Sequence, residues 1–227
     1  MIARVTLFLW IAVWLCVAFL WAPLVPGLGE STRVLYFHVP CAWVTVLALG
    51  WSMIHSLLYL ARRRIGHDDH AAAAAGLGLV FCIGATVTGS LWAKAAWHSY
   101  WNWDPRETSI FFLLLIYGAY LALRSAIEGE ERRARLSAIY SAVAFITVPF
   151  LVFVVPRIYF SLHPDPLINE GGKIEMDSRI RISFLAMMVG FSGLFAWLQS
   201  LKVRLLRLER RHAERDSTAV ETLRGTA

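Results

Sequence analysis

Charged residues are scarce in this chain of 227 residues: only 17% are Asp, Glu, Lys or Arg, whereas 58% are hydrophobic. Soluble domains are about a quarter charged, and disordered chains combine high charge with low hydrophobicity. The composition therefore excludes a disordered chain. It also argues against a soluble all-α core, which would have too little polar surface to dissolve.

Cysteine motifs are missing as well. Cys16, Cys41 and Cys82 lie far apart, and neither C-x-x-C nor C-x-x-C-H occurs. This absence excludes a thiol oxidoreductase of that type and a covalent c-type haem carrier. We interpret the three cysteines as small buried hydrophobic residues. A basic soluble domain that could hold nucleic acid is also lacking, despite the net charge of +6.

Six long stretches contain no charge at all. They are 16 to 28 residues long and cover residues 5–29, 34–61, 71–93, 108–123, 136–156 and 182–201. Because a helix needs about 20 apolar residues to cross the hydrocarbon core, the sequence predicts an all-α, polytopic membrane protein. We place its six spans at about 5–22, 39–61, 74–95, 106–124, 137–156 and 181–201. They form one domain, 1–201, followed by a basic cytoplasmic tail, 202–227.

Lys and Arg are unevenly divided between the two sides of such a bundle. With the N-terminus in the cytoplasm, fifteen of them lie inside and seven outside, as the excess of positive charge in cytoplasmic loops requires. We therefore expect both termini inside, the tail anchored at the membrane surface, and outward connections at about 24–38, 94–106 and 157–180. Within the spans, the alanine run 71–75 predicts close helix packing, and Pro149 predicts a kink.

The middle outward connection is crowded with aromatic residues. Trp97, Tyr100, Trp101 and Trp103 place four large rings in seven residues, whereas a membrane interface needs only one or two per helix end. Trp97 and Trp101 are four residues apart, so a short helix would present both on one face. The segment therefore indicates a shelf for a flat apolar ligand about as strongly as it indicates an interfacial belt.

The residues after this shelf have the pattern of a helix start. Asp104 suits the N-cap, Pro105 the first helical position, and Glu107 the third position of a capping box. The sequence therefore predicts that the fourth span begins here.

One histidine lies in each flanking outward connection. His38 stands in Y-F-H-V-P before the second span, and His163 stands in S-L-H-P-D-P after the fifth. A proline follows each closely, which disfavours helix there. A single loop histidine is usually a plain surface residue. Two that bracket an aromatic shelf are candidates for the axial ligands of haem iron.

The other histidines are weaker candidates. His55, inside the second span, is as consistent with a hydrogen bond between helices as with a function. His67 and His70 could bind a metal as an i,i+3 pair, but a solvated cytoplasmic turn is the better interpretation. His98 is a candidate third iron ligand, and His212 in the tail carries no signal.

The segment 97–108, with its W-x-W-D-P-R-E-T core, resembles the tryptophan-rich WWD signature of the haem-handling proteins of cytochrome c maturation. Together with six spans, F-H-V-P before the second and S-L-H-P after the fifth, it is similar to the CcmC family over residues 5–201. Tyr100 and Ala93 depart from that pattern, since family members often have Trp and Gly there.

This resemblance implies which residues bind haem and what becomes of it. His38 and His163 would ligate the iron, and a set of neighbouring residues would hold the porphyrin: Trp97, Tyr100, Trp101, Trp103 and Asp104. Arg106 is our choice for pairing with the propionates, because a bidentate arginine suits a carboxylate.

The protein would not be an enzyme. It would hold haem b, non-covalently and transiently, at the outer face of the bacterial inner membrane and deliver it to the haem chaperone CcmE. The ABC transporter components CcmA and CcmB and the small membrane protein CcmD are the other partners that the resemblance implies.

Two other functions stay open from the sequence. A haem transporter predicts polar groups along a path through the midplane, which the first, third and sixth spans almost lack. An electron-transferring b-type membrane cytochrome predicts paired histidines inside the spans, and only His55 is clearly inside one.

Overall fold

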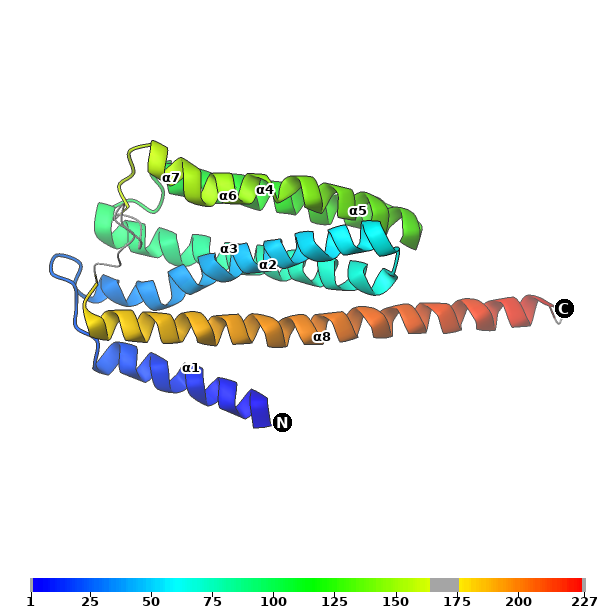
Figure 1. Cartoon of the computed structure of the whole chain (residues 1–227), viewed down its shortest axis with the longest axis horizontal. Coiled ribbons are helices and arrows are strands. Elements are labelled where there is room, and N and C mark those ends of the chain that lie inside the picture. Colours follow the sequence, from blue (N-terminus) through cyan, green and yellow to red (C-terminus); the bar gives the residue numbers. More distant parts are fainter. Residues whose placement is uncertain (1, 164–175, 226–227) are drawn as a thin grey trace.

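The computed structural model describes residues 2–163 and 176–225, and the side chains of all of these except 214 and 217–225. Within these residues the protein is a bundle of helices with six segments long and apolar enough to cross a membrane, as the sequence predicts (Figure 1). They are Ile2–Leu20, Glu30–Arg62, Ile65–Trp97, Pro105–Ala126, Glu130–Ile158 and Ser178–Ala213. The chain is therefore a multi-pass membrane protein.

The elements follow one another along the chain, and the connection between the last two is the longest, at residues 159–177. They are α1 (Ile2–Leu20), the short 3-10 helix η1 (Glu30–Val34), α2 (Leu35–Arg62), α3 (Ile65–Trp97), α4 (Pro105–Ala126), α5 (Glu130–Ala144), α6 (Thr147–Pro149), the π-helical turn η2 (Phe150–Val154), α7 (Val155–Ile158) and α8 (Ser178–Gly225). The segments α5, α6, η2 and α7 together form the fifth span. Within this span the helix changes from α to π geometry directly after Pro149.

The helices lie roughly side by side, with α2 and α3 in the middle of the bundle (Figure 1). The start of α1 and the end of α8 lie at one end, which we name the termini end. The opposite end carries the connections 21–34, 98–104 and 159–163, and we name it the site end. Both candidate axial histidines and the tryptophan-rich segment belong to the site end.

The close contact of α2 with α3 depends on small residues. The side chains of Ala71, Ala73, Ala74 and Ala75 are buried, so the close packing predicted from the alanine run is confirmed. A Cβ on Gly78 would come within 2.7 Å of the Leu49 side chain. Ser52 adds a polar link, because its hydroxyl bonds to the Ala71 carbonyl at 2.9 Å and to the Ser141 hydroxyl at 3.0 Å.

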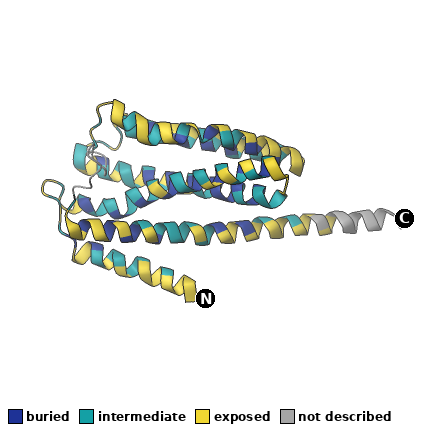
Figure 2. Cartoon of the chain, in the orientation of Figure 1, coloured by how far each residue is buried: buried dark blue, intermediate teal, exposed yellow. Residues whose placement is uncertain are grey.

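The first helix, α1, packs against the last one, α8. Leu7 lies over Gly193, and Trp10 lies beside Gly190 and donates from its indole N–H to the Ala186 carbonyl at 2.9 Å. Most of the remaining surface of α1 is exposed (Figure 2). This exposure suits a helix that faces lipid on its other sides.

One local expectation is wrong. His38 and Pro40 do not precede the second span in a loop, because α2 begins at Leu35 and includes both. A membrane bundle tolerates such a proline, since neighbouring helices can satisfy the backbone group that it frees. The basic tail continues the last span as a helix, because α8 extends past the bundle (Figure 1).

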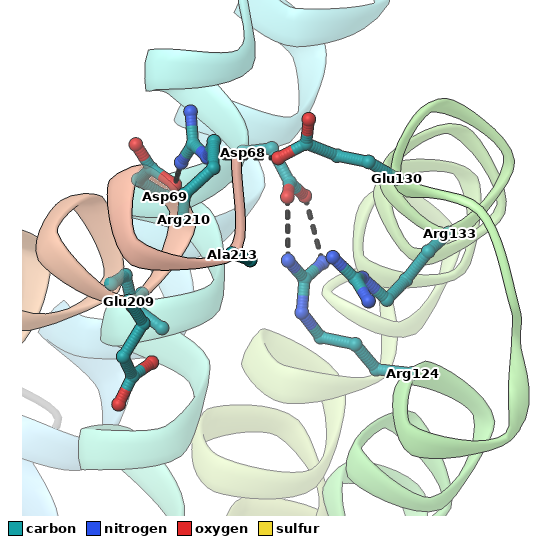
Figure 3. Close-up of a pocket in the computed structure, with 9 residues that line it drawn as sticks. Asp68, Asp69, Arg124, Glu130, Arg133, Glu209, Arg210 and Ala213 are labelled. Atoms are coloured by element: carbon teal, nitrogen blue, oxygen red, sulfur yellow. Dashed lines mark hydrogen bonds and ion pairs between the residues drawn. The ribbon is translucent and has the colours of Figure 1, made fainter. Parts of the chain in front are cut away.

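At the termini end, two adjacent aspartates at the start of α3 bind arginines of other helices. Arg124 of α4 holds Asp68 with two hydrogen bonds of 2.7 and 2.5 Å. Arg210 of α8 binds Asp69 and also Glu130 of α5. These side chains line a cavity of about 480 Å³ (Figure 3). The network ties four helices together at this end.

We expect Arg124→Met to lower the free energy of unfolding by about 3–5 kcal/mol, because it leaves the buried Asp68 carboxylate without its partner. Thermal unfolding in detergent measures this change. The double variant Asp68→Asn/Arg124→Met should regain much of the loss. As a control, Arg179→Ala removes an exposed ion pair with Asp177 and should change stability little. Equal losses from Arg124→Met and Arg179→Ala would contradict the assignment.

Candidate functional site

At the site end, the carboxylate of Asp104 forms hydrogen bonds with the loop that carries His163. It lies 2.9 Å from the Nδ1 atom of His163, accepts from the Leu162 backbone N–H at 2.7 Å, and accepts from the Ser161 hydroxyl at 2.9 Å. The Asp104 side chain is only 1% exposed, and that of His163 only 15%. Water therefore competes little for these hydrogen bonds.

The protonation states follow from burial and from these contacts. Burial raises the pKa of Asp104, but hydrogen bonds from the Arg106 and Leu162 N–H groups and from Ser161 outweigh it, so the pKa is lowered. Burial lowers the pKa of His163 to about 4, against the opposing effect of Asp104. At neutral pH an ionised carboxylate thus faces a neutral imidazole. Because the carboxylate can only accept, Nδ1 carries the proton and Nε2 carries a free lone pair.

His38 has the same tautomer, but a different acceptor fixes it. On α2, its Nδ1 atom lies 2.9 Å from the backbone carbonyl of Ala85 on α3 and 3.3 Å from the Thr88 hydroxyl. A carbonyl can only accept, so Nδ1 carries the proton and Nε2 again has a free lone pair. The ring is packed against Gly89, where a Cβ would come within 2.8 Å of the Cε1 atom of His38.

His38, His163 and Arg106 are electrostatic neighbours. The positive charge of Arg106 contributes to lowering the pKa of His163, less than burial does. The three predicted residues thus lie at the same end of the bundle, on α2, on the loop after α7 and on the first turn of α4.

The aromatic residues form two groups instead of one shelf. Helix α3 ends at Trp97, and His98 takes a left-handed conformation with φ 60°. Trp97 and Trp101 therefore do not share a helix face, and that expectation is wrong. Trp97 lies against His163, with ring centroids 4.8 Å apart. Trp101 instead contacts Trp103 at 5.8 Å.

Three further aromatic rings, those of Trp92, Phe111 and Tyr100, lie near these two groups or beside them. Trp92 stacks on His163 with centroids 5.9 Å apart, although its sequence position alone did not single it out as a site residue. The ring of Trp103 also contacts that of Phe111, with centroids 5.8 Å apart, and Trp103 is 65% exposed. Tyr100 is 57% exposed and lies under the ammonium group of Lys94. Trp92 and Trp97 are therefore the rings next to the histidine, while Trp103 and Tyr100 face outward.

The predicted start of the fourth span is confirmed. Asp104 is the N-cap of α4, Pro105 is its first residue, and Asp104 and Glu107 form a capping box. The Arg106 N–H donates to Asp104 at 2.9 Å, and Glu107 accepts from the N–H groups of Asn102 and Asp104. The capping residue is thus also the residue that holds His163.

Histidines also meet toward the termini end, which the sequence did not predict. His67 and His70 lie on α3 and not in a solvated turn. The Nδ1 atoms of His55 and His67 are 3.3 Å apart, and the ring of His70 stacks on that of His55. Within the described ranges 2–163 and 176–225, no three His, Cys, Asp or Glu side chains are arranged to hold a metal ion.

The remaining candidates fall outside this site. The side chain of His98 is exposed at the end of α3, and His212 is exposed far along α8. The three residues that follow His163 in S-L-H-P-D-P, Pro164, Asp165 and Pro166, lie outside the described residues.

Comparisons with known proteins agree on one family. The family model for "heme exporter protein C" matches residues 1–218. The heme exporter protein C of Bradyrhizobium diazoefficiens is 34% identical over 81% of this chain and 69% of its own length. That of Rhodobacter capsulatus is 30% identical over 82% of this chain and 77% of its own. That of Escherichia coli K12 is 28% identical over 81% of this chain and 74% of its own length.

Proposed function

The chain belongs to the heme exporter protein C family, whose members handle haem for cytochrome c biogenesis, and from this premise we propose that it binds haem b at the site end through His38 and His163. The haem is cargo, which the protein holds without covalent attachment and passes on chemically unaltered. The protein therefore acts in delivery and not as an enzyme.

The observation that carries this proposal is the shared tautomer of the two histidines. Each donates from Nδ1 to a fixed acceptor, the Ala85 carbonyl for His38 and the Asp104 carboxylate for His163. Histidines that ligate metals commonly donate from the other ring nitrogen to such an acceptor, which orients the ring and makes the ligating nitrogen more basic. Two neutral imidazoles prepared in this way suit the two axial positions of haem iron.

The surroundings of the histidines suit the rest of a haem molecule. Trp92 and Trp97 offer indole surface beside His163, and such surface can cover a porphyrin. Trp101, Trp103 and Tyr100 extend the apolar surface outward. The positive charge of Arg106 acts near both histidines, so its guanidinium group is the natural partner for a propionate.

The proposed location and partners follow from the family and the charge pattern. With both termini in the cytoplasm, the site end faces the outside of the bacterial inner membrane. From there the protein would hand haem to the chaperone CcmE and work with CcmA, CcmB and CcmD. Membrane lipid surrounds the bundle, and no nucleic acid takes part.

The absorption spectrum of the purified protein tests this function. Protein solubilised in mild detergent from haem-replete cells should show low-spin, six-coordinate haem b in both the ferric and the ferrous states. When purified apo-CcmE is added, the haem should leave the protein and appear covalently bound to the chaperone. A preparation that carries no haem and binds none after titration with hemin would overturn the proposal.

A further inference from the structure

The two histidines of the site are held with very different rigidity. His38 lies inside α2, where helical hydrogen bonds fix its backbone on both sides. Its ring is confined by the Ala85 carbonyl, by Thr88 and by the surface of Gly89, all on α3. This ring cannot turn without disturbing the contact between α2 and α3.

In the described residues that precede it, His163 has no such helical support. The last helical turn before it, α7, ends at Ile158, and residues 159–163 form a loop. Near His163, the hydroxyl of Ser161 and the N–H of Leu162 donate to Asp104, and the His163 N–H donates to Ser161. Among the described residues, this imidazole is therefore positioned by the Asp104 carboxylate, which belongs to another part of the chain, and by the rings of Trp92 and Trp97.

Asp104 combines two tasks that can be separated by mutation. As the N-cap of α4 it accepts from the Arg106 N–H, and serine or asparagine performs that task about as well. As the acceptor for His163 it must reach across to the loop and carry a charge. Serine lacks the length for the second task, and asparagine has the length but lacks the charge.

We propose that His163 is the axial ligand that dissociates when haem is passed on, that His38 is the ligand that stays, and that Asp104 is the positioning residue that controls the exchange. This inference rests on the proposed function. In the exchange, the bond between iron and the Nε2 atom of His163 breaks and its electron pair remains on the imidazole. A donor atom of the receiving partner then takes the open coordination position, so no electron transfer is needed.

Carbon monoxide provides the test, because it binds reduced haem only after one axial ligand has left. In the haem-loaded, dithionite-reduced protein, Asp104→Ser should raise the rate of carbon monoxide binding about ten- to hundredfold, the range expected for losing one hydrogen bond to an ionised acceptor. Asp104→Asn keeps the cap and a neutral acceptor, so its rate should lie between those of Asp104→Ser and the wild type.

Asp177 supplies a matched control. It directly precedes α8 and accepts from the Arg179 N–H at 2.8 Å, as a helix-capping aspartate does. It lies at the same end of the bundle, so Asp177→Ser removes a helix-capping carboxylate there that is exposed, whereas that of Asp104 is buried. This variant should bind carbon monoxide at the wild-type rate. An equal acceleration in Asp104→Ser and Asp177→Ser, or none in Asp104→Ser, would overturn the inference.

The reduction potential gives a second readout that a purely structural role of Asp104 would not move. Asp104→Asn removes a negative charge next to the ligating imidazole, so the potential should rise. Asp177→Asn should leave it unchanged. An unchanged potential in Asp104→Asn would count against the positioning role. A wild-type protein without a histidine-dependent low-spin spectrum would instead overturn the proposed function, so the two failures are distinguishable.

Discussion

Replacing either of the two histidines that we propose as axial ligands should remove the low-spin haem spectrum. In His38→Gly or His163→Gly, iron keeps at most one protein ligand and becomes high-spin, and haem affinity falls by about tenfold or more, which corresponds to at least about 1.4 kcal/mol of binding free energy. Absorption spectroscopy and haem content per mole of protein measure the two effects. Because each substitution leaves a space the size of an imidazole, added imidazole should restore the low-spin spectrum.

The exposed His212 is the matched control, since His212→Gly removes a histidine far from the site end. Its spectrum and haem content should equal those of the wild type. If both His38→Gly and His163→Gly kept the wild-type spectrum, the ligand assignment would be wrong.

Gly89→Ala should disturb the site although it replaces neither histidine. The new Cβ would lie 2.8 Å from the Cε1 atom of His38 and 3.2 Å from its Nδ1 atom. The ring must move away from the Ala85 carbonyl, so the bond that fixes its tautomer is lost. Overpacking of this kind typically costs about 1–3 kcal/mol. We expect a mixture of high- and low-spin haem and faster loss of haem to an acceptor such as apomyoglobin.

The control for this variant lies on the same helix. Around Gly76 nothing would meet an added Cβ within 4 Å. Gly76→Ala should therefore leave haem binding unchanged and, by helix propensity, stabilise α3 by at most about 1 kcal/mol. Identical haem loss in the two variants would show that the helix, and not the contact with His38, is responsible.

The features that could be predicted from the sequence are those that a short stretch of chain determines by itself. Six charge-free stretches predict six spans because the membrane penalises charge wherever it occurs. The capping box of Asp104 and Glu107 was predictable because its partners are three residues apart. The packing of Ala71 to Ala75 was predictable because small side chains always permit close approach.

The features that could not be predicted depend on contacts between distant segments. Asp104 and His163 are 59 residues apart, and no periodicity links them. The proline rule placed His38 in a loop, but the surrounding bundle tolerates Pro40 inside α2. Trp97 and Trp101 have helical spacing, yet the chain leaves the helix at His98. In each example the arrangement of neighbouring helices outweighs the local preference.

The packing of α1 against α8 has a consequence for biosynthesis. The ribosome makes α1 before α8, so Leu7 and Trp10 are in the membrane without these partners until Gly190 and Gly193 have been inserted. The same is true of Asp69, whose partner Arg210 follows later still. The contacts of α1 and of Asp69 with α8 therefore form only after α8 has been made. A nascent chain stalled before α8 would present the inner face of α1 and the carboxylate of Asp69 to the quality-control proteases of the membrane.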